Sequence, residues 1–342
     1  MIRLIVLLSV FCITDIAFSM SEKPASTNEL TVYSARKEHL VKPLFEAYEK
    51  QTGVKIKYIT DKAGALLTKL QAEGKNSPAD MLITVDAGNL WQAANSNLLE
   101  PVNSEKLSAN IPSHLRSPDN TWFGLSIRAR TIAYNPKKVK KSELSTYEAL
   151  SEKSWKGRVC LRTSKKVYNQ SLVAMFMQQY GEKRTEEIVS GWVNNLAAPV
   201  FSNDTAVLEA IAAGQCDVGI VNTYYFGRLM KKNPKLNLAL FWPNQNVKAK
   251  NNRGVHVNIS GAGIVKTSKN KMASQKFLEW LSSKEAQAKF AQINLEYPVH
   301  PKTGNDPLVD SWGKFDPSLI NVSFAGKNQA KAIRLMDRSK YK

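Results

Sequence analysis

Asp217-Val-Gly-Ile-Val-Asn-Thr-Tyr-Tyr-Phe-Gly227 contains a short apolar run, two helix-capping residues and a pair of tyrosines. The run from Val218 to Val221 predicts a buried strand. The Asn and Thr that follow it favour the N-cap position, and the residues after them predict a helix that reaches Lys231. Tyr224 and Tyr225 therefore lie in the first turn of a helix at the carboxyl end of a strand. In open α/β sheets, ligands bind at that edge.

Two other segments of the chain repeat this arrangement. The strand predicted at Leu30 to Ser34 contains Tyr33 and leads into a helix. The strand predicted at Arg158 to Arg162 leads, through Tyr168, into a helix that begins near residue 171. Four tyrosines thus fall at junctions between a strand and a helix. Because such junctions meet at one edge of a parallel sheet, we expect a tyrosine-lined site there.

Strand and helix patterns alternate along most of the 342 residues, which predicts an α/β fold with mainly parallel sheets. The pattern gives helices at 39–52, 63–73 and 87–95, and strands at 54–60 and 81–85. Two longer strand patterns, 125–134 and 254–260, can pass between two lobes. We therefore expect discontinuous lobes, 20–125 plus 255–302 and 126–254 plus 303–342, with hinge strands near residues 126 and 255 and a cleft between them.

The first nineteen residues predict an export signal that is cleaved near residue 19, because a basic start, an apolar core from Leu4 to Phe11 and the small-x-small motif Ala17-Phe-Ser19 follow one another. A retained anchor is the alternative. Without the signal two cysteines remain, Cys160 and Cys216. An even count in an exported protein favours a disulfide between them over two separate buried thiols. The sequence therefore predicts an exported protein.

The formal net charge of +19 is compatible with nucleic acid, an anionic surface or an anionic ligand as partner. The basic residues are spread along the whole chain, and no helix-turn-helix, RNP-type or zinc-finger pattern accompanies them. We interpret most of this charge as a solvated basic surface, and we expect no nucleic acid partner.

Catalytic motifs are absent from the sequence. It contains no HExxH, GxSxG, Walker loop or EF-hand spacing, and no cluster of histidines and cysteines that favours zinc or copper. Gly261-Ala-Gly263 is too short for a dinucleotide fingerprint and predicts a tight turn. We therefore expect a binding protein and not an enzyme; a secreted hydrolase on the same scaffold would need a nucleophile and base that the sequence does not supply.

The tyrosines instead point to a hard cation. A free phenol has a pKa of about 10, so phenolate ligation at neutral pH needs a strongly charged metal to displace the proton. Ferric iron meets that requirement, whereas calcium and magnesium recruit carboxylates and carbonyls. Arg36 and Arg128 are placed either to offset excess phenolate charge and hold a small anion, or to form ordinary ion pairs.

The chain resembles the bacterial periplasmic ferric-ion-binding proteins, the substrate-binding subunits of iron(III) ABC transporters. The resemblance extends from Leu30 to about Pro301. It is carried by Val32-Tyr-Ser-Ala-Arg36, Pro78-Ala-Asp80, Thr84-Val-Asp-Ala-Gly88, Val167-Tyr-Asn-Gln-Ser171, Val221-Asn-Thr-Tyr-Tyr225 and Glu296-Tyr-Pro-Val299. One branch of this family uses a histidine in the first strand-to-helix loop and a glutamate after the Pro-Ala-Asp strand. Val85 stands at that glutamate position here, with Asp86 beside it, so the chain resembles the tyrosine-rich branch.

The resemblance implies a type II periplasmic binding protein, a transferrin-like clam shell whose lobes are mainly parallel sheets flanked by helices. It implies a monomer that captures Fe³⁺ in the cleft and delivers it to an inner-membrane ABC permease. The implied iron ligands are Tyr33, Tyr168, Tyr224 and Tyr225. Arg36, Arg128, Asn222 and Asp86 would surround them or hold a synergistic anion such as carbonate. The alternative is the same fold with an organic or oxyanion ligand, such as a polyamine, thiamine, a phosphonate or a sulfate-like ion.

Overall fold

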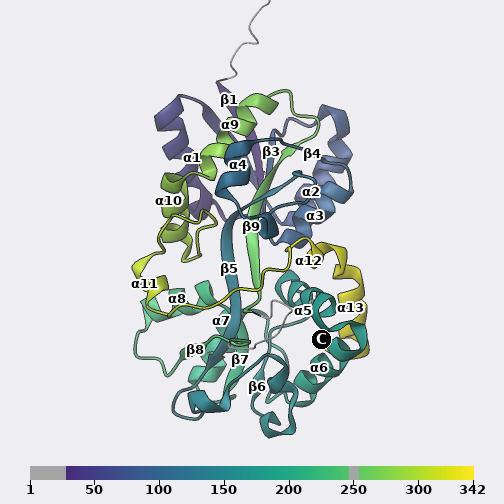
Figure 1. The fold of residues 1–342 in the computed structure, drawn as a ribbon, viewed down its shortest axis with the longest axis vertical. Coiled ribbons are helices and arrows are strands. Elements are labelled where there is room, and N and C mark those ends of the chain that lie inside the picture. Colours follow the sequence, from purple (N-terminus) through teal and green to yellow (C-terminus); the bar gives the residue numbers. More distant parts are fainter. Residues whose placement is uncertain (1–27, 246–253) are drawn as a thin grey trace, which may run out of the picture.

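Two long strands join the two halves of the molecule. The computed structural model describes residues 28–245 and 254–342, so the predicted signal at 1–19 lies outside the described part. Strands β5 (Phe123–Tyr134) and β9 (Val257–Val265) run side by side from the upper half to the lower half in Figure 1. They pair antiparallel, from Phe123 opposite Ala262 to Ala129 opposite Val257. The strand patterns at 125–134 and 254–260 overlap β5 and β9.

A single mixed sheet of nine strands runs through both halves, in the order β2-β1-β3-β9-β5-β7-β6, with β4 on β9 and β8 on β5. In the upper half β1 pairs parallel with β2 and β3, and in the lower half β6 pairs parallel with β7. The crossing strands pair antiparallel with their neighbours. The strands are β1 Glu29–Ser34, β2 Lys55–Thr60, β3 Met81–Val85, β4 Leu99–Glu100, β6 Val159–Cys160, β7 Val218–Asn222 and β8 Ala239–Phe241.

Helices cover the sheet on both sides (Figure 1). Those of the upper half are α1 Glu38–Thr52, α2 Ala63–Glu73, α3 Ala87–Asn95, α4 Glu105–Asn110, α9 Lys271–Leu281 and α10 Lys284–Asn294. Those of the lower half are α5 Val167–Tyr180, α6 Glu182–Asn194, α7 Asp204–Ala212 and α8 Thr223–Lys232. The C-terminal segment adds α11 Pro307–Asp310, α12 Phe324–Lys327 and α13 Gln329–Arg338. None of the described helices is long and apolar enough to cross a membrane.

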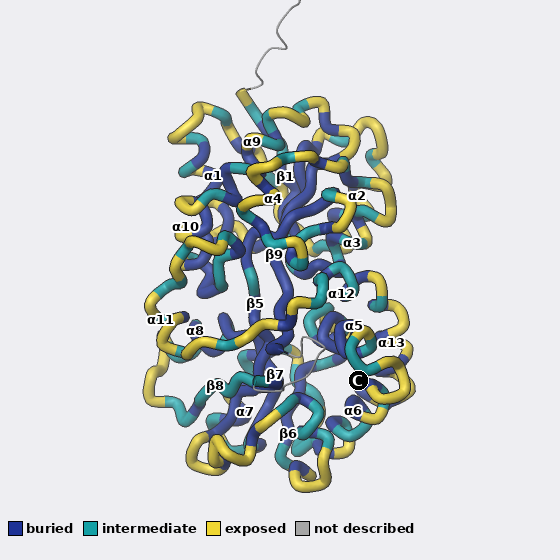
Figure 2. The backbone as a smooth tube through the Cα atoms, viewed as in Figure 1, coloured by how far each residue is buried: buried dark blue, intermediate teal, exposed yellow. Residues whose placement is uncertain are grey.

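Amphipathic patterning explains how the helices pack. In α1 the apolar side chains fall on one buried face, and Gly53 ends the helix with a left-handed φ of 74° that favours glycine. Figure 2 shows the same principle in the whole molecule, with buried strands inside and exposed helix faces outside. The buried apolar residues form one core above, drawn mostly from 30–125 and 259–299, and further cores below, drawn mostly from 132–241.

Three local expectations have clear outcomes. Cys160 and Cys216 form a disulfide, as the cysteine count favoured. Gly261-Ala-Gly263 is not a turn, because it lies inside β9 between β3 and β5. A Cβ on Gly261 would lie 2.5 Å from the carbonyl oxygen of Phe123, so the glycine permits close packing of backbone. Tyr168 lies in the first turn of α5, because that helix begins at Val167 and not near residue 171.

Candidate functional site

Three of the predicted tyrosines come together because β6 and β7 are parallel neighbours. The carboxyl ends of the two strands lie at the same edge of the sheet, and each strand leads into a helix. Tyr168 is the second residue of α5, and Tyr224 and Tyr225 are the second and third residues of α8. The rings of Tyr224 and Tyr225 lie 4.4 Å apart between centroids. Tyr224 is buried, while Tyr168 and Tyr225 are partly exposed.

Arginines surround the tyrosine rings. The guanidinium carbons of Arg128 and Arg162 lie 5.2 and 5.1 Å from the centroid of the Tyr168 ring. Arg228 lies 5.0 Å from the ring of Tyr224. Arg128 was predicted at this position, whereas Arg162 was missed. Its signal in the sequence was its place at the carboxyl end of the strand predicted at 158–162, the same kind of position that singled out the tyrosines.

Burial and neighbouring phenols make Tyr224 and Tyr225 weaker acids than a free phenol. Burial raises the pKa of Tyr224, and the nearby hydroxyls of Tyr168 and Tyr225 raise it further, whereas the charge of Arg128 opposes the shift. Burial and Tyr168 also raise the pKa of Tyr225, against a hydrogen bond with Tyr224 and the charge of Arg162. Tyr224 and Tyr225 therefore hold their protons at neutral pH until a cation displaces them.

The buried carboxylate of Asp204 binds two arginines of the site, Arg130 and Arg162. Asp204 accepts hydrogen bonds from Arg130 at 3.0 Å, from Arg162 at 3.1 Å and from the backbone N–H of Asn222 at 2.9 Å. The Asn222 side chain accepts from Arg130 at 3.2 Å and donates to the Tyr224 hydroxyl at 3.3 Å. Asn222 is thus at the site, as predicted, and Asp204 is a further member. Asp204 begins a helix far from any tyrosine in the sequence, so no motif pointed to it.

A cavity of about 10 Å³ lies behind Tyr168, which is room for about one water-sized group. It is lined by Asp86, Arg128, Arg130, Tyr168, Asn222, His256 and Asn258. The Nε atoms of Arg128 and Arg130 are buried there without a hydrogen-bond partner among the described residues. Burial and the two arginines lower the pKa of His256 to about 3, so its imidazole is neutral.

Asp86 reaches this cavity from the upper half. Its carboxylate accepts hydrogen bonds from the Gly88 N–H at 2.9 Å, the Asn258 amide at 2.9 Å and the Ser171 hydroxyl at 2.7 Å. Burial raises its pKa, and Arg128 opposes that shift. Ser171 belongs to α5 of the lower half, so this side chain joins the two halves next to Tyr168.

Tyr33 and Arg36 lie apart from the three tyrosines in their contacts. The Tyr33 hydroxyl donates to Glu73 of α2 at 2.9 Å, and burial together with that carboxylate raises its pKa. Arg36 forms a buried ion pair with Glu296 at 3.1 Å and donates further hydrogen bonds to Ser260 and Asn294. For Arg36 the structure therefore has the ordinary ion pair that the sequence left open.

No group of three or more His, Cys, Asp or Glu side chains in residues 28–245 and 254–342 is arranged to hold a metal ion. A cation at the edge formed by β6 and β7 would therefore be held by phenol oxygens. Three phenolates carry three negative charges, which match the charge of a trivalent ion. Phenolate oxygen is also a donor that hard cations prefer.

The chain is similar to bacterial solute-binding proteins and to proteins named for iron uptake and ferric iron binding. A family model described as bacterial extracellular solute-binding protein matches residues 43–317. The chain is 41% identical to iron uptake protein A1 of Synechocystis over 94% of this chain and 90% of that protein. It is 43% identical, with a TM-score of 0.87, to the solved Trichodesmium protein IdiA (FutA) in complex with iron and citrate, over 92% of this chain and 100% of that one. It is also 23% identical to the major ferric iron-binding protein of Neisseria meningitidis, over 95% and 96%.

Proposed function

Because this chain belongs to the bacterial extracellular solute-binding proteins, we propose that it captures ferric iron between its two lobes and delivers it to an ABC transporter. The observation that carries the proposal is the convergence of Tyr168, Tyr224 and Tyr225 at one sheet edge. Relatives named for iron uptake and ferric iron binding support the choice of metal. The protein binds and releases its ligand without changing a bond in it, so it is not an enzyme.

In this proposal the three phenolates are the iron ligands. Their charges balance Fe³⁺, and Arg128 and Arg162 stabilise the phenolate form of Tyr168 from two sides. Three phenolates suit a hard trivalent ion better than the organic ligands that the fold also accepts in other proteins.

Tyr33 and a synergistic anion would contribute to iron binding only after contacts in the present structure change. Tyr33 would ligate iron as a fourth phenolate only after its hydroxyl leaves Glu73, so its contribution depends on a rearrangement of α2. A synergistic anion such as carbonate would be held by Arg128 beside Tyr168, with Asn222 and Asp86 as neighbours, and the water-sized cavity there would have to widen to admit it. Arg36 would take part only by giving up Glu296.

We also propose a location, an oligomeric state and lobe boundaries for the protein. We propose a periplasmic monomer, released by cleavage near residue 19, that docks on an inner-membrane permease. The lobes would comprise 20–125 plus 255–302 and 126–254 plus 303–342. The buried cores above and below the middle of β5 and β9 support that division for most of the chain, and the C-terminal segment contributes Val322 to the upper core and residues 332–341 to the lower one.

A visible absorption spectrum of the mature protein, before and after ferric citrate is added, tests the proposal. Tyrosinate bound to Fe³⁺ should give a broad charge-transfer band in the visible, and Tyr224→Phe should lose most of it. Tyr58→Phe is the matched control, because the Tyr58 hydroxyl contacts Glu38 away from α5 and α8. The absence of a band in excess iron would exclude tyrosinate-bound iron and leave an organic or oxyanion ligand to be found.

A further inference from the structure

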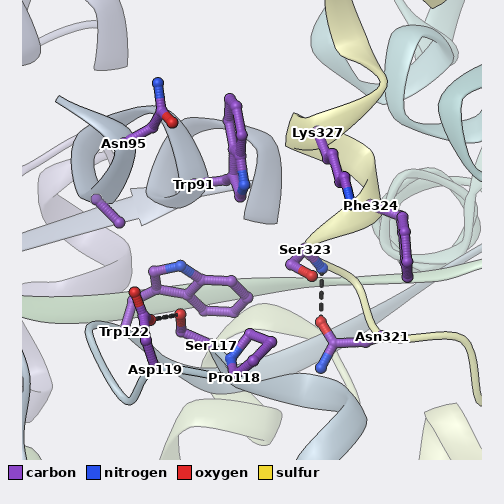
Figure 3. A pocket seen from close by; sticks show the side chains of 11 residues that line it. Trp91, Asn95, Ser117, Pro118, Asp119, Trp122, Asn321, Ser323, Phe324 and Lys327 are labelled. Carbon is purple, nitrogen blue, oxygen red and sulfur yellow. Dashed lines mark hydrogen bonds between the residues drawn. The ribbon is translucent and has the colours of Figure 1, made fainter.

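A second pocket, unrelated to the tyrosines, lies between α3, the turn at 117–122 and the C-terminal segment (Figure 3). Its volume is about 400 Å³, which is in the range of small-molecule sites. It is lined chiefly by Trp91, Trp122, Phe324, Pro118, Asp119 and Lys327, and it shares no lining residue with the cavity behind Tyr168. Figure 3 shows Trp91 on one side of the space and the indole of Trp122 on the other, with Phe324 and Lys327 entering from α12.

The walls of this pocket are fixed by packing. A Cβ on Gly326 would lie 2.4 Å from the Cβ of Trp91, so α12 packs against α3 as closely as a glycine allows. The amide of Asn321 donates to the carbonyls of Ser113 and Arg116, and its oxygen accepts from the Ser323 N–H at 2.9 Å. These bonds tie the C-terminal segment to the upper half. The aromatic faces are therefore present before a ligand arrives.

Two opposite charges stand on different sides of the pocket without an ion-pair partner among the described residues. Asp119 takes hydrogen bonds on Oδ1 alone, from Ser117 and Thr121. Although burial raises the pKa of Asp119, these bonds hold it below its usual value, so the group is a carboxylate. Lys327 is exposed, and its ammonium lies 5.4 Å from the Phe324 ring. In Figure 3 the carboxylate and the ammonium lie at opposite ends of the aromatic space.

A third polar group of the pocket is unsatisfied. The Nε1 of Trp122 is buried and has no hydrogen-bond partner in the part of the chain that the structure describes. A buried donor without a partner is rare and needs an explanation, such as a ligand or an ordered water. Because the Trp122 side chain has no exposed surface, an ordered water fits this donor better than a ligand in the pocket.

We propose that this pocket binds a small zwitterion with a flat apolar body, of the aromatic α-amino acid class. The ring would lie between the side chains of Trp91 and Phe324, where aromatic side chains pack favourably on one another. The ammonium would face Asp119 and the neighbouring aromatic surface, which also attracts cations. The carboxylate would face Lys327. A ligand with one charge would meet only one of these partners and would leave the other charge without a counterion.

Isothermal titration calorimetry of the mature protein with L-phenylalanine tests this proposal. Its two single-charge analogues, 3-phenylpropionate and 2-phenylethylamine, should bind at least about tenfold more weakly, a difference of about 1.4 kcal/mol. Asp119→Asn should weaken L-phenylalanine and leave 3-phenylpropionate unchanged or tighter. Lys327→Met should weaken L-phenylalanine and leave 2-phenylethylamine unchanged or tighter. Lys331→Met, an exposed lysine outside the pocket, is the matched control and should have no effect.

Three results would overturn the proposal. They are no saturable heat up to millimolar L-phenylalanine, affinity that neither Asp119→Asn nor Lys327→Met changes, and an analogue that binds as tightly as the zwitterion. The variants should fold, because Asn keeps the Oδ1 acceptor of the turn and Met keeps the apolar stem of the lysine. Circular dichroism melting of each variant verifies this. The test does not depend on iron, so its outcome is separate from that of the ferric site.

Discussion

At the scale of single residues, the site combines groups that disfavour phenolate with groups that favour it. Burial and crowding raise the pKa of Tyr224 and Tyr225, and the arginines oppose that rise. Without a cation these phenols therefore stay neutral and cost little to bury. With a trivalent cation the same crowding becomes favourable, because three phenolates share one strong positive charge. The site is thus prepared for a metal that can displace protons.

Iron binding should therefore release protons. A free phenol has a pKa of about 10, and burial raises the pKa of Tyr224 and Tyr225, so the formation of three phenolates on Fe³⁺ should release about three protons. The apparent affinity should fall as the pH falls, by up to about tenfold per pH unit for each phenolate. Titration in buffers of different ionisation enthalpy measures the number of protons. Release of fewer than one proton per iron would contradict phenolate ligation.

Arg162 should set the pH at which the iron complex forms. Its charge opposes the raised pKa of Tyr225, and its guanidinium also lies over Tyr168. Arg162→Gln should therefore shift the pH midpoint of the visible band upward, and Arg162→Lys should restore part of the shift. Arg158→Gln, which removes a partly exposed ion pair with Asp217, is the control. An unchanged midpoint in Arg162→Gln would mean that Arg162 is only structural.

At the scale of elements, the strands determine which side chains meet. The strand ends at β6 and β7 were predictable, and so was the meeting of Tyr168 with Tyr224 and Tyr225, because local apolar patterns mark those strands. The contact of Asp204 with Arg130 and Arg162 was not predictable, because it depends on how α7 packs against β7. The prediction of a turn at Gly261 and Gly263 was wrong for a similar reason. Glycines usually mark turns, and only the long-range pairing of β9 shows that these two admit neighbouring backbone.

The disulfide should hold this part of the sheet together. It joins Cys160 at the end of β6 to Cys216 just before β7, across a separation of 56 residues. Closing a loop of that length lowers the entropy of the unfolded chain, and the model for this effect gives about 4 kcal/mol. The double variant Cys160→Ser/Cys216→Ser should lose about that much free energy of unfolding in urea titrations. A loss below about 1 kcal/mol would show that the bond constrains the unfolded chain little.

At the scale of the whole molecule, a few polar contacts join the two halves beside β5 and β9. Asp86 at the end of β3 accepts from Ser171 of α5, and Gln92 of α3 donates to Gln329 of α13. Asp86 has a φ of 76°, which costs a residue with a side chain about 1–3 kcal/mol. This strained residue is the one whose carboxylate joins the two halves beside Tyr168. We therefore interpret this contact as one that stabilises the closed arrangement.

Ser171→Ala should shift the molecule toward an open form. It removes the hydroxyl that Asp86 binds across the cleft and leaves the bonds from Gly88 and Asn258 in place. A hydrogen bond to a charged group contributes about 1.5–3 kcal/mol, so iron affinity should fall by roughly 10- to 150-fold. The number of protons released should not change, because no ligand is lost.

Small-angle X-ray scattering should show a larger radius of gyration at subsaturating iron. Ser190→Ala, whose hydroxyl bonds Ser339 within the lower half, should change neither quantity. Equal affinity in Ser171→Ala and the unmodified protein would mean that closure depends on the metal alone and that Asp86 serves only the turn at the end of β3.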